Sequence, residues 1–364
     1  MQEELYLMIS VDTLMNNNQN LADDDFLEYA LAHGFGDIHF KVDPETGMKA
    51  IVAIHSTKLG PALGGCRFIE YPDTLSALKD ALRLARGMSF KAASVNLPLG
   101  GGKSVIIKPK GMFNRTAYMH QFGAFVNELN GRYITALDSG TVLSDMDIIA
   151  EHTDYVASLS KHNGDPSPST SMGVLRGIQA AVAFKLGRDN LNGIHVAIQG
   201  LGHVGFALAK HLHELGAVLT VADISSATVD LAVKEFGATA VHTDMIHKVP
   251  CDVFAPCALG AIINDLSIPQ LQTTIIAGAA NNQLAHSFHG KKLHEKGILY
   301  AADYVINAGG LIFAAAKYLH THEDTVQDQI DGIYTSLTEI FIRSAQDNLP
   351  ASEIADTIAQ EKLA

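Results

Sequence analysis

The chain is poor in basic residues and in cysteine. Its 364 residues include 26 Lys and Arg against 39 Asp and Glu, which gives a net charge of −13. No basic stripe appears, so we expect no nucleic-acid partner. The three cysteines, Cys66, Cys251 and Cys257, form no C-x-x-C pair. Scattered cysteines in an odd number are typical of a reducing compartment, so the sequence predicts a cytoplasmic protein.

Long hydrophobic runs and metal-ligand spacings are also missing. No run of eighteen apolar residues exists, so we expect no membrane span. The chain opens with Met1-Gln2-Glu3-Glu4, which lacks the apolar core of a signal peptide. The 17 histidines form no H-x-x-x-H cluster with acidic companions. We therefore predict no metal site and interpret the histidines as surface or packing residues.

The length is enough for two domains. In the first half, Asp37–Val42 and Met48–Ser56 alternate around a turn, which predicts a hairpin. Other expected elements are helices at about 24–32, from 73 or 74 to near Lys91, and at 114–129, and a strand at 132–136 that leads to Asp138. The turn-rich segment 163–169 is expected to be the hinge between the domains.

The second half alternates strands with helices, which predicts a parallel sheet. A strand at 194–199 precedes Gly200-Leu201-Gly202-His203-Val204-Gly205, and a helix follows. In this setting G-x-G-x-x-G predicts a Rossmann dinucleotide site, where the first two glycines allow the turn and the approach of the pyrophosphate and the third allows helix and strand to pack. Asp223 ends the next strand and favours NAD over NADP. The simpler alternative is a packing turn without a nucleotide.

Three glycines, Gly100, Gly101 and Gly102, directly precede Lys103. Without β-carbons the backbone can crowd around one ammonium and take positive φ where needed. Such an amine loses hydration, which lowers its pKa toward neutrality, and a second lysine, Lys91, should act in the same direction. We therefore expect Lys103 to be a candidate base near pH 7.

Two other interpretations of this segment stay open. Gly102-Lys103-Ser104 resembles the end of a phosphate loop, but that motif needs a glycine at the position of Leu97. The β-branched run after Ser104 also predicts a strand where a phosphate loop needs a helix. The plainest alternative is a glycine-rich turn with a solvated lysine.

Together the motifs resemble those of the glutamate/leucine/phenylalanine/valine dehydrogenases, and the likeness is closest to the leucine dehydrogenases. The matching segments are Gly60–Gly65, Lys91, Leu97–Lys103, Asp138 and Asn307–Gly310. The likeness covers nearly the whole chain apart from its N-terminal extension.

The resemblance implies an N-terminal α/β catalytic domain and a Rossmann-type NAD-binding domain, separated by an active-site cleft. The catalytic domain would span residues 1–165, joined by a C-terminal helical segment at roughly 335–364, and the NAD-binding domain 166–334. The implied activity is reversible oxidative deamination of an L-amino acid by NAD to the 2-oxo acid, ammonium and NADH. The family forms homo-oligomers, so we expect one here.

The resemblance also assigns roles to single residues. The lysine matching Lys91 pairs with the substrate carboxylate, the one matching Lys103 is the base that activates water, and the aspartate matching Asp138 shuttles protons to and from the amine. Taken alone, a carboxylate at a strand end such as Asp138 is more often a cap or an ion-pair partner.

The substrate pocket should be apolar. Family members that act on glutamate carry a lysine at the position of Leu63, and neither Leu63 nor the other pocket positions, Ala136, Leu311 and Ala314, offers a charge. A buried carboxylate there would lack a partner, so leucine, valine or isoleucine should be preferred. Alanines at the pocket edge leave open an enzyme that prefers phenylalanine or has broad specificity.

The remaining candidates complete the predicted site. Thr170, Asn281 and Asn307 match positions on the nicotinamide side, and Asn281 is expected to reach the substrate. Substrate-binding candidates are therefore Lys91, Leu63, Gly64, Ala136, Asn281, Leu311 and Ala314. Cofactor-binding candidates are Gly200, Gly202, Val204, Gly205, Asp223, Thr170 and Asn307.

Several residues depart from the usual family pattern. Leu137 and Ser139 flank Asp138 where glutamate and valine are usual, Asn96 replaces a glycine, and Asp165 replaces an asparagine. None of these changes removes a proposed catalytic group. A non-catalytic NAD-binding regulator is a further alternative, but it would not need Lys103 or Asp138.

Overall fold

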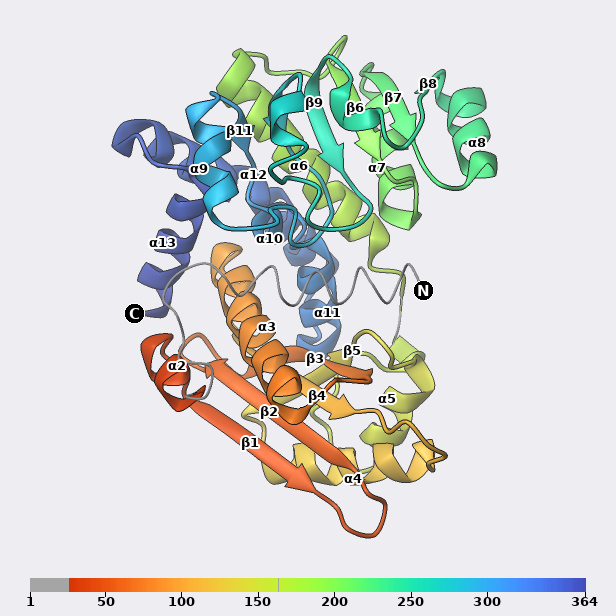
Figure 1. The fold of residues 1–364 in the computed structure, drawn as a ribbon, viewed down its shortest axis with the longest axis vertical. Helices are drawn as coiled ribbons and strands as arrows, with labels where there is room; N and C mark the ends of the chain where they lie inside the picture. The colour runs from red at the N-terminus through yellow and green to blue at the C-terminus, as the bar shows by residue number, and fades with distance from the viewer. Residues whose placement is uncertain (1–25, 163) are drawn as a thin grey trace. The chain divides into compact units, whose positions relative to one another are not determined.

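The computed structural model describes residues 26–162 and 164–364. Within them the chain forms two compact units, each with its own sheet (Figure 1). Of the described residues, the N-terminal unit comprises 26–162, 164, 313–323 and 359–364, and the C-terminal unit comprises 165–312 and 324–358. No described helix is long and apolar enough to cross a membrane. The N-terminal extension and position 163 of the expected hinge lie outside the described residues.

The N-terminal unit contains a five-stranded sheet of order β1-β2-β4-β3-β5. Its strands are β1 (Asp37–Val42), β2 (Lys49–Ser56), β3 (Ala62–Ile69), β4 (Gly100–Ile107) and β5 (Tyr133–Leu137). β1 and β2 form the expected hairpin, and β2 is antiparallel to β4. β4 and β5 both run parallel to β3, so the carboxyl ends of these three strands meet at one edge.

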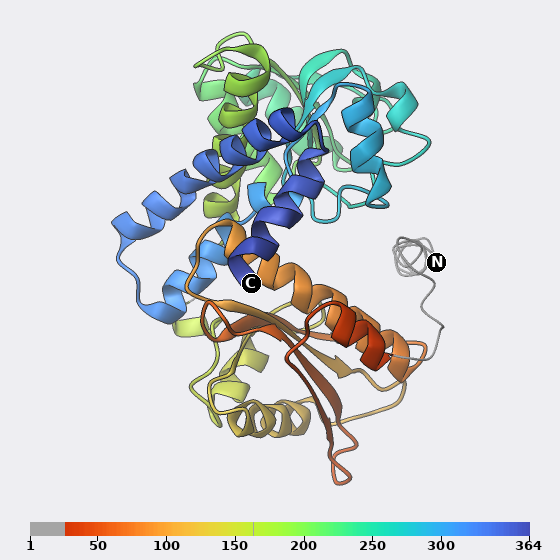
Figure 2. The same cartoon turned by 90° about the vertical axis from the view of Figure 1, so that its left-hand side faces the viewer.

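Helices cover both faces of this sheet (Figure 2). On one face, α3 (Thr74–Ser94) packs its apolar stripe, which includes Leu78 and Leu82, against Val105 of β4. Its first turn is capped by Asp73, whose carboxylate accepts a hydrogen bond from Ser76 N at 2.7 Å. On the other face lie α4 (Arg115–Glu128) and α5 (Leu143–Ala150). The short helix α2 (Phe26–Ala32) matches the described part of the helix expected at 24–32.

The C-terminal unit contains a six-stranded sheet of order β11-β10-β9-β6-β7-β8, and all of its strands are parallel. The strands are β6 (His195–Gln199), β7 (Val218–Ala222), β8 (Thr239–Ala240), β9 (Cys251–Pro256), β10 (Thr273–Ile276) and β11 (Leu299–Tyr300). Numbered within this unit, the order from β8 is 3-2-1-4-5-6, which is the Rossmann order. The topological switch point, where such folds bind dinucleotides, lies between β6 and β9.

The helices of the second half are α6 (Ser167–Leu186), α7 (His203–Glu214), α8 (Ser226–Phe236), α9 (Phe288–Glu295), α10 (Asp303–Ile306), α11 (Gly309–Leu319), α12 (Glu323–Asp347) and α13 (Ala351–Leu363). The chain divides at 164/165, and the C-terminal segment is shared between the units differently from the division expected from the sequence. Only residues 359–364 of the segment 335–364 fall in the N-terminal unit.

The packing of α12 explains this difference. Its buried stripe lies against α6, where Gly173 faces Ile333, Gly177 faces Leu337, and the rings of Phe184 and Phe341 are 5.6 Å apart. The stripe has the helical spacing of Ile330, Ile333, Leu337, Ile340 and Phe341, and all five side chains are buried. The spacing of the stripe could not show which element α12 packs against, because apolar spacing carries no information about the partner.

Candidate active site

Lys103 lies in the middle of β4, and its side chain is almost completely buried. Its Nζ contacts the Oδ2 of Asp138, which follows the end of β5. The two residues are 35 positions apart in sequence, and the parallel pairing of β4 and β5 with β3 brings them together. The predicted catalytic pair therefore forms within one unit.

The glycines before Lys103 serve close packing. They belong to β4 itself, and none of them has positive φ. A β-carbon at Gly101 would overlap the backbone nitrogen of Ser89 in α3, and one at Gly64 would overlap the carbonyl oxygen of Gly102. The freedom of glycine to take positive φ is therefore not used here, and the alternative of a glycine-rich turn with a solvated lysine is wrong. The glycines are needed because the helix and the neighbouring strand approach too closely for side chains. The strand that follows Lys103 also rules out a phosphate loop.

Burial is the main electrostatic influence on Lys103. It lowers the pKa of Lys103 from 10.5 to about 7, because the charged form loses its hydration. The next contribution in the same direction comes from the guanidinium of Arg67, and Arg83 adds a smaller one. The sequence had suggested Lys91 for this role but did not point to the two arginines that act in this way. An amine with this pKa is partly neutral at pH 7 and can accept a proton.

The loop after β5 holds Asp138 in place. The backbone N–H of Asp138 donates to Thr141 Oγ1 at 3.0 Å, and that hydroxyl donates to the carbonyl of Cys66 at 3.0 Å. A β-carbon at Gly65 would lie 2.7 Å from the Cβ of Asp138, so only glycine leaves room for this side chain. The N–H of Ser139 donates to Asp138 Oδ1 at 2.5 Å. Because the donor is the backbone N–H, any residue other than proline at position 139 could make the same hydrogen bond.

Arg67 and Asp80 form a charged network behind this pair that the sequence interpretation missed. Arg67 Nη1 donates to Asp80 Oδ2 at 2.7 Å, and its Nη2 lies 3.7 Å from Asp138 Oδ1. Asp80 also accepts from the Tyr71 hydroxyl at 2.7 Å and from Arg83 at 2.9 Å. A signal was present, because Asp80 interrupts the apolar stripe of α3 and is only 8% exposed. A buried carboxylate on such a stripe needs cationic partners.

The strand register places part of the predicted substrate pocket beside Lys103. Leu63 pairs with Gly101 and with Ile134, so Leu63, Lys103 and Ala136 share one face of the sheet. Gly64 points to the opposite face, and its carbonyl accepts a hydrogen bond from the Tyr133 hydroxyl at 2.7 Å.

The other substrate candidates lie on helices and loops. Lys91 is half-buried in the last turn of α3, the helix that packs on Gly101. The division between units falls within α11, so that Leu311 belongs to the C-terminal unit and Ala314 to the N-terminal unit. Both side chains are half-buried.

The glycine motif after β6 has the geometry of a dinucleotide turn. Gly200 has a φ of +93°, which favours glycine, and a β-carbon at Gly205 would overlap the carbonyl oxygen of Gly200. By contrast, a β-carbon at Gly202 would meet nothing within 4 Å. Gly202 caps α7, and the half-buried Val204 lies in its first turn. This open space at a helix N-terminus fits a pyrophosphate.

Asp223 follows β7 and faces this turn. Its Oδ2 accepts a hydrogen bond from Leu201 N at 2.6 Å, and its Oδ1 accepts one from Ser225 N at 2.8 Å. The carboxylate thus fixes the turn while each oxygen keeps a second lone pair for a ribose hydroxyl.

Asn307 contributes the unpaired polar atom of the C-terminal unit that best fits a ligand. Its Nδ2 donates to Ala279 O at 3.0 Å and to Asn281 Oδ1 at 2.8 Å, while its buried Oδ1 has no partner among the described residues. Thr170 lies in α6, and its Oγ1 donates to Pro166 O at 2.9 Å. A β-carbon at Gly310 would lie 2.9 Å from that Oγ1, so Thr170 is close to the start of α11. The buried Oδ1 of Asn307, which lacks a donor among the described residues, could accept a hydrogen bond from the carboxamide N–H of a nicotinamide.

Two family profiles match the chain. A family profile described as Glu/Leu/Phe/Val dehydrogenase, dimerisation domain, matches residues 35–155. A second, described as Glutamate/Leucine/Phenylalanine/Valine dehydrogenase, matches residues 163–233 and 227–364. The chain belongs to this dehydrogenase family.

Individual relatives agree with this assignment. Leucine dehydrogenase of Geobacillus stearothermophilus is 48% identical over 342 residues, which cover 93% of each chain. Leucine dehydrogenase of Thermoactinomyces intermedius is 50% identical over 324 residues, which cover 88% of each chain. The crystal structure of L-tryptophan dehydrogenase from Nostoc punctiforme matches with a TM-score of 0.86 at 41% identity, covering 93% of this chain and 98% of that one. The family resemblance and the fold class are confirmed.

Two departures of this dehydrogenase from the family pattern have structural explanations. Asn96 has a φ of +54°, a conformation in which asparagine is the usual substitute for glycine, and its side chain accepts a hydrogen bond from Lys362 at 2.9 Å. Asp165 accepts a hydrogen bond from Ser167 N at 2.9 Å at the start of α6, which an asparagine oxygen could also do.

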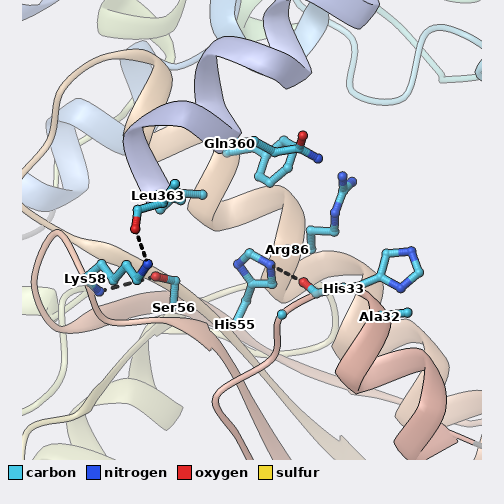
Figure 3. A pocket seen from close by; sticks show the side chains of 11 residues that line it. Ala32, His33, His55, Ser56, Lys58, Arg86, Gln360 and Leu363 are labelled. Carbon is cyan, nitrogen blue, oxygen red and sulfur yellow. Dashed lines mark hydrogen bonds between the residues drawn. The ribbon is translucent and has the colours of Figure 1, made fainter.

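A separate pocket of this dehydrogenase is shown in Figure 3. Its lining includes His33, His55, Lys58, Arg86 and Leu363, and Lys58 Nζ donates to the carbonyl oxygen of Ala364 at 2.5 Å. The described lining contains none of the catalytic or substrate candidates. We therefore assign this pocket no part in the reaction.

Proposed function

We propose that this dehydrogenase catalyses the reversible oxidative deamination of branched-chain L-amino acids with NAD. The observation that carries the proposal is the buried contact between Lys103 and Asp138 beside the apolar side chains of Leu63 and Ala136. The amino acid, NAD and water give the 2-oxo acid, ammonium, NADH and a proton. The leucine dehydrogenases among the relatives support this substrate class.

The residues divide the chemistry between them. NAD, when bound at the turn after β6, would supply the acceptor for the hydride of the substrate Cα. Lys91 pairs with the α-carboxylate, and neutral Lys103 takes a proton from water as the water adds to the substrate imine. Asp138, in contact with Lys103, receives this proton and returns it to the departing amine, which leaves as ammonia and becomes ammonium.

The choice of NAD over NADP rests on Asp223. Its carboxylate can accept hydrogen bonds from the ribose hydroxyls and would repel a 2′-phosphate. Gly200, Gly202, Val204 and Gly205 would surround the pyrophosphate at the start of α7, and Asn307 would accept the carboxamide N–H. Thr170 would lie on the same side.

The apolar pocket leaves a second substrate class. Alanine at positions 136 and 314 leaves room for a larger side chain, and a tryptophan dehydrogenase is among the structural relatives. An enzyme of broad specificity that also accepts phenylalanine is therefore the alternative. A non-catalytic regulator is disfavoured, because a pure NAD-binding protein has no need of the Lys103–Asp138 pair.

We also propose that the enzyme is a cytoplasmic homo-oligomer. The profile that matches residues 35–155 is described as a dimerisation domain. In agreement, the edge strand β1 leaves Phe40 51% and Val42 66% exposed, and apolar edge strands are suited to pairing with another copy. Size-exclusion chromatography with light scattering would measure the number of subunits. A monomer would contradict this proposal.

The activity can be tested by following NADH absorbance with a panel of L-amino acids. We expect turnover with leucine, valine and isoleucine, little with glutamate, and near-total loss in Lys103→Ala. Equal or higher kcat/KM for phenylalanine would support the alternative. Tight NAD binding without NADH formation from any amino acid would contradict an enzymatic role.

A further inference from the structure

Three potential metal ligands lie together on the N-terminal unit, outside the catalytic cluster. His120 belongs to α4, while Glu151 and His152 follow the end of α5. His120 Nδ1 lies 2.8 Å from His152 Nε2 and 3.7 Å from Glu151 Oε2. The three ligand atoms all lie within 4.8 Å of one another. Two imidazoles and one carboxylate thus converge on one point.

The packing of α4 against the end of α5 creates this convergence. A β-carbon at Gly123, one turn after His120, would lie 2.7 Å from the carbonyl oxygen of Ile149 and 3.1 Å from the Cβ of His152. Only glycine at this position lets the two segments approach so closely. The two imidazole rings are nearly perpendicular, with centroids 5.0 Å apart. The Nδ1 of His120 and the Nε2 of His152 can therefore face each other without stacking of the rings.

The donor set fits a small divalent transition-metal ion. Imidazole nitrogen and carboxylate oxygen are common zinc ligands, with bonds of about 2.0–2.2 Å. Tetrahedral coordination at such bond lengths separates two ligand nitrogens by roughly 3.3 Å. The N···N separation of 2.8 Å between the two histidines and the N···O separation of 3.7 Å between His120 and Glu151 lie on either side of this value, and the third pair of ligand atoms lies within 4.8 Å. Small side-chain rotations would therefore complete the geometry.

We propose that His120, Glu151 and His152 form a zinc-binding site, with water as the fourth ligand. His120 is half-buried, and the other two residues are exposed, so the ion can enter from solvent. No interpretation of spacing could have found this site, because the two histidines are 32 positions apart. The opposing interpretation is a plain N–H···N hydrogen bond between two surface histidines.

A zinc ion here would fasten α5 to α4. The other end of the same helix pair already holds the loop that carries Asp138. Arg115, the first residue of α4, donates to Asp145 Oδ2 at 2.6 Å and to the carbonyl oxygen of Gly140 at 2.7 Å. Zinc would provide a second fastening at the carboxyl end of α5. Its expected effect is therefore on stability, and the reaction does not depend on it.

Equilibrium dialysis against ZnCl₂, with metal analysis of the full-length protein, tests the proposal. We expect wild type to retain one more zinc ion per chain than His120→Ala/His152→Ala, and Glu151→Gln to retain it with weaker affinity. His242→Ala is the matched control, since His242 is an exposed histidine 3.4 Å from Asp244 and belongs to another unit. This control should bind like wild type. Equal zinc content in wild type and the double variant would overturn the proposal.

Two further measurements keep the result interpretable. NAD-dependent turnover and circular dichroism should be the same for all variants, because neither histidine belongs to the catalytic cluster. Zinc should raise the midpoint of thermal unfolding of wild type and of His242→Ala but leave that of the double variant unchanged. A zinc-induced rise of the same size in the double variant would also overturn the proposal, whatever the enzymatic activity proves to be.

Discussion

At Lys103, two electrostatic influences oppose each other. Burial disfavours the ammonium most strongly, while the nearby carboxylate of Asp80 favours it. The outcome is a pKa of about 7 for Lys103, against 10.5 for the free side chain. Because the folded pKa is the lower one, the unfolded chain binds more protons between these values. This group therefore destabilises the fold most below pH 7, and the penalty disappears as the pH rises toward 10.5.

Arg67 is expected to influence the pH dependence of the reaction through the pKa of Lys103. Replacing it with methionine removes the cation that most favours neutral Lys103, so the pKa of Lys103 should rise. The pH at which kcat/KM for leucine reaches half its maximum should move upward by at least ~0.5, while Arg67→Lys keeps the wild-type profile. Arg83→Met should give a smaller shift in the same direction. An unchanged profile in Arg67→Met, with the protein folded, would contradict this positioning role.

Leu63 is expected to influence the substrate preference. The side chain is 2% exposed and shares a face with Lys103. Leu63→Lys should lower kcat/KM for leucine by at least ~10-fold, because it places a buried charge in an apolar pocket. Leu63→Met, which keeps the volume, should lose less than this. If Leu63→Lys uses leucine as well as wild type does, Leu63 does not line the substrate pocket.

At the scale of elements, the contact between α3 and β4 determines where Lys91 and Lys103 lie. The contact depends on glycines in a strand, a position where glycine is usually unfavourable. The sequence indicated that this glycine run was special and that a strand followed it. The sequence could not show that these glycines make room for α3. That helix lies in an earlier segment, and its apolar spacing does not specify which strand it packs against.

Gly101→Ala tests this contact. A methyl group there would overlap Ser89 in α3, so we expect loss of several kcal/mol of folding free energy or no folded protein. Gly87→Ala is the matched control, because Gly87 lies in the same helix with nothing within 4 Å of the added carbon. It should be neutral or stabilising by up to ~1 kcal/mol. Urea unfolding of both variants measures the difference, and similar midpoints would refute the packing role.

Asp223, at the end of β7, tests the cofactor proposal. Asp223→Asn keeps one acceptor for the turn at Leu201 but removes the negative charge. The ratio of kcat/KM with NAD to that with NADP should fall by at least ~10-fold, or about 1.4 kcal/mol. Initial rates with each cofactor give this ratio. A ratio that does not change would mean that Asp223 only supports the turn.

At the scale of the whole molecule, the sequence indicated two α/β units and the boundary near 165, because the Rossmann motif and the alternation of strands and helices are local signals. Two features could not be predicted from the sequence: the position of α12 in the C-terminal unit and the contact of His120 with His152. Both depend on contacts between distant segments that carry no short-range pattern. Asp80 is intermediate, since its place on an apolar stripe was visible but its partner Arg67 was not.

The proposed mechanism depends on the charge of one amine in the working enzyme. NMR of isotopically labelled lysine side chains, with NAD and a non-reactive leucine analogue bound, can follow the ionisation of Lys103, and the signal missing from Lys103→Ala identifies it. We expect a titration midpoint near 7, together with a rise in the deamination rate over the same pH range. A midpoint that stays near 10.5 would contradict the mechanism.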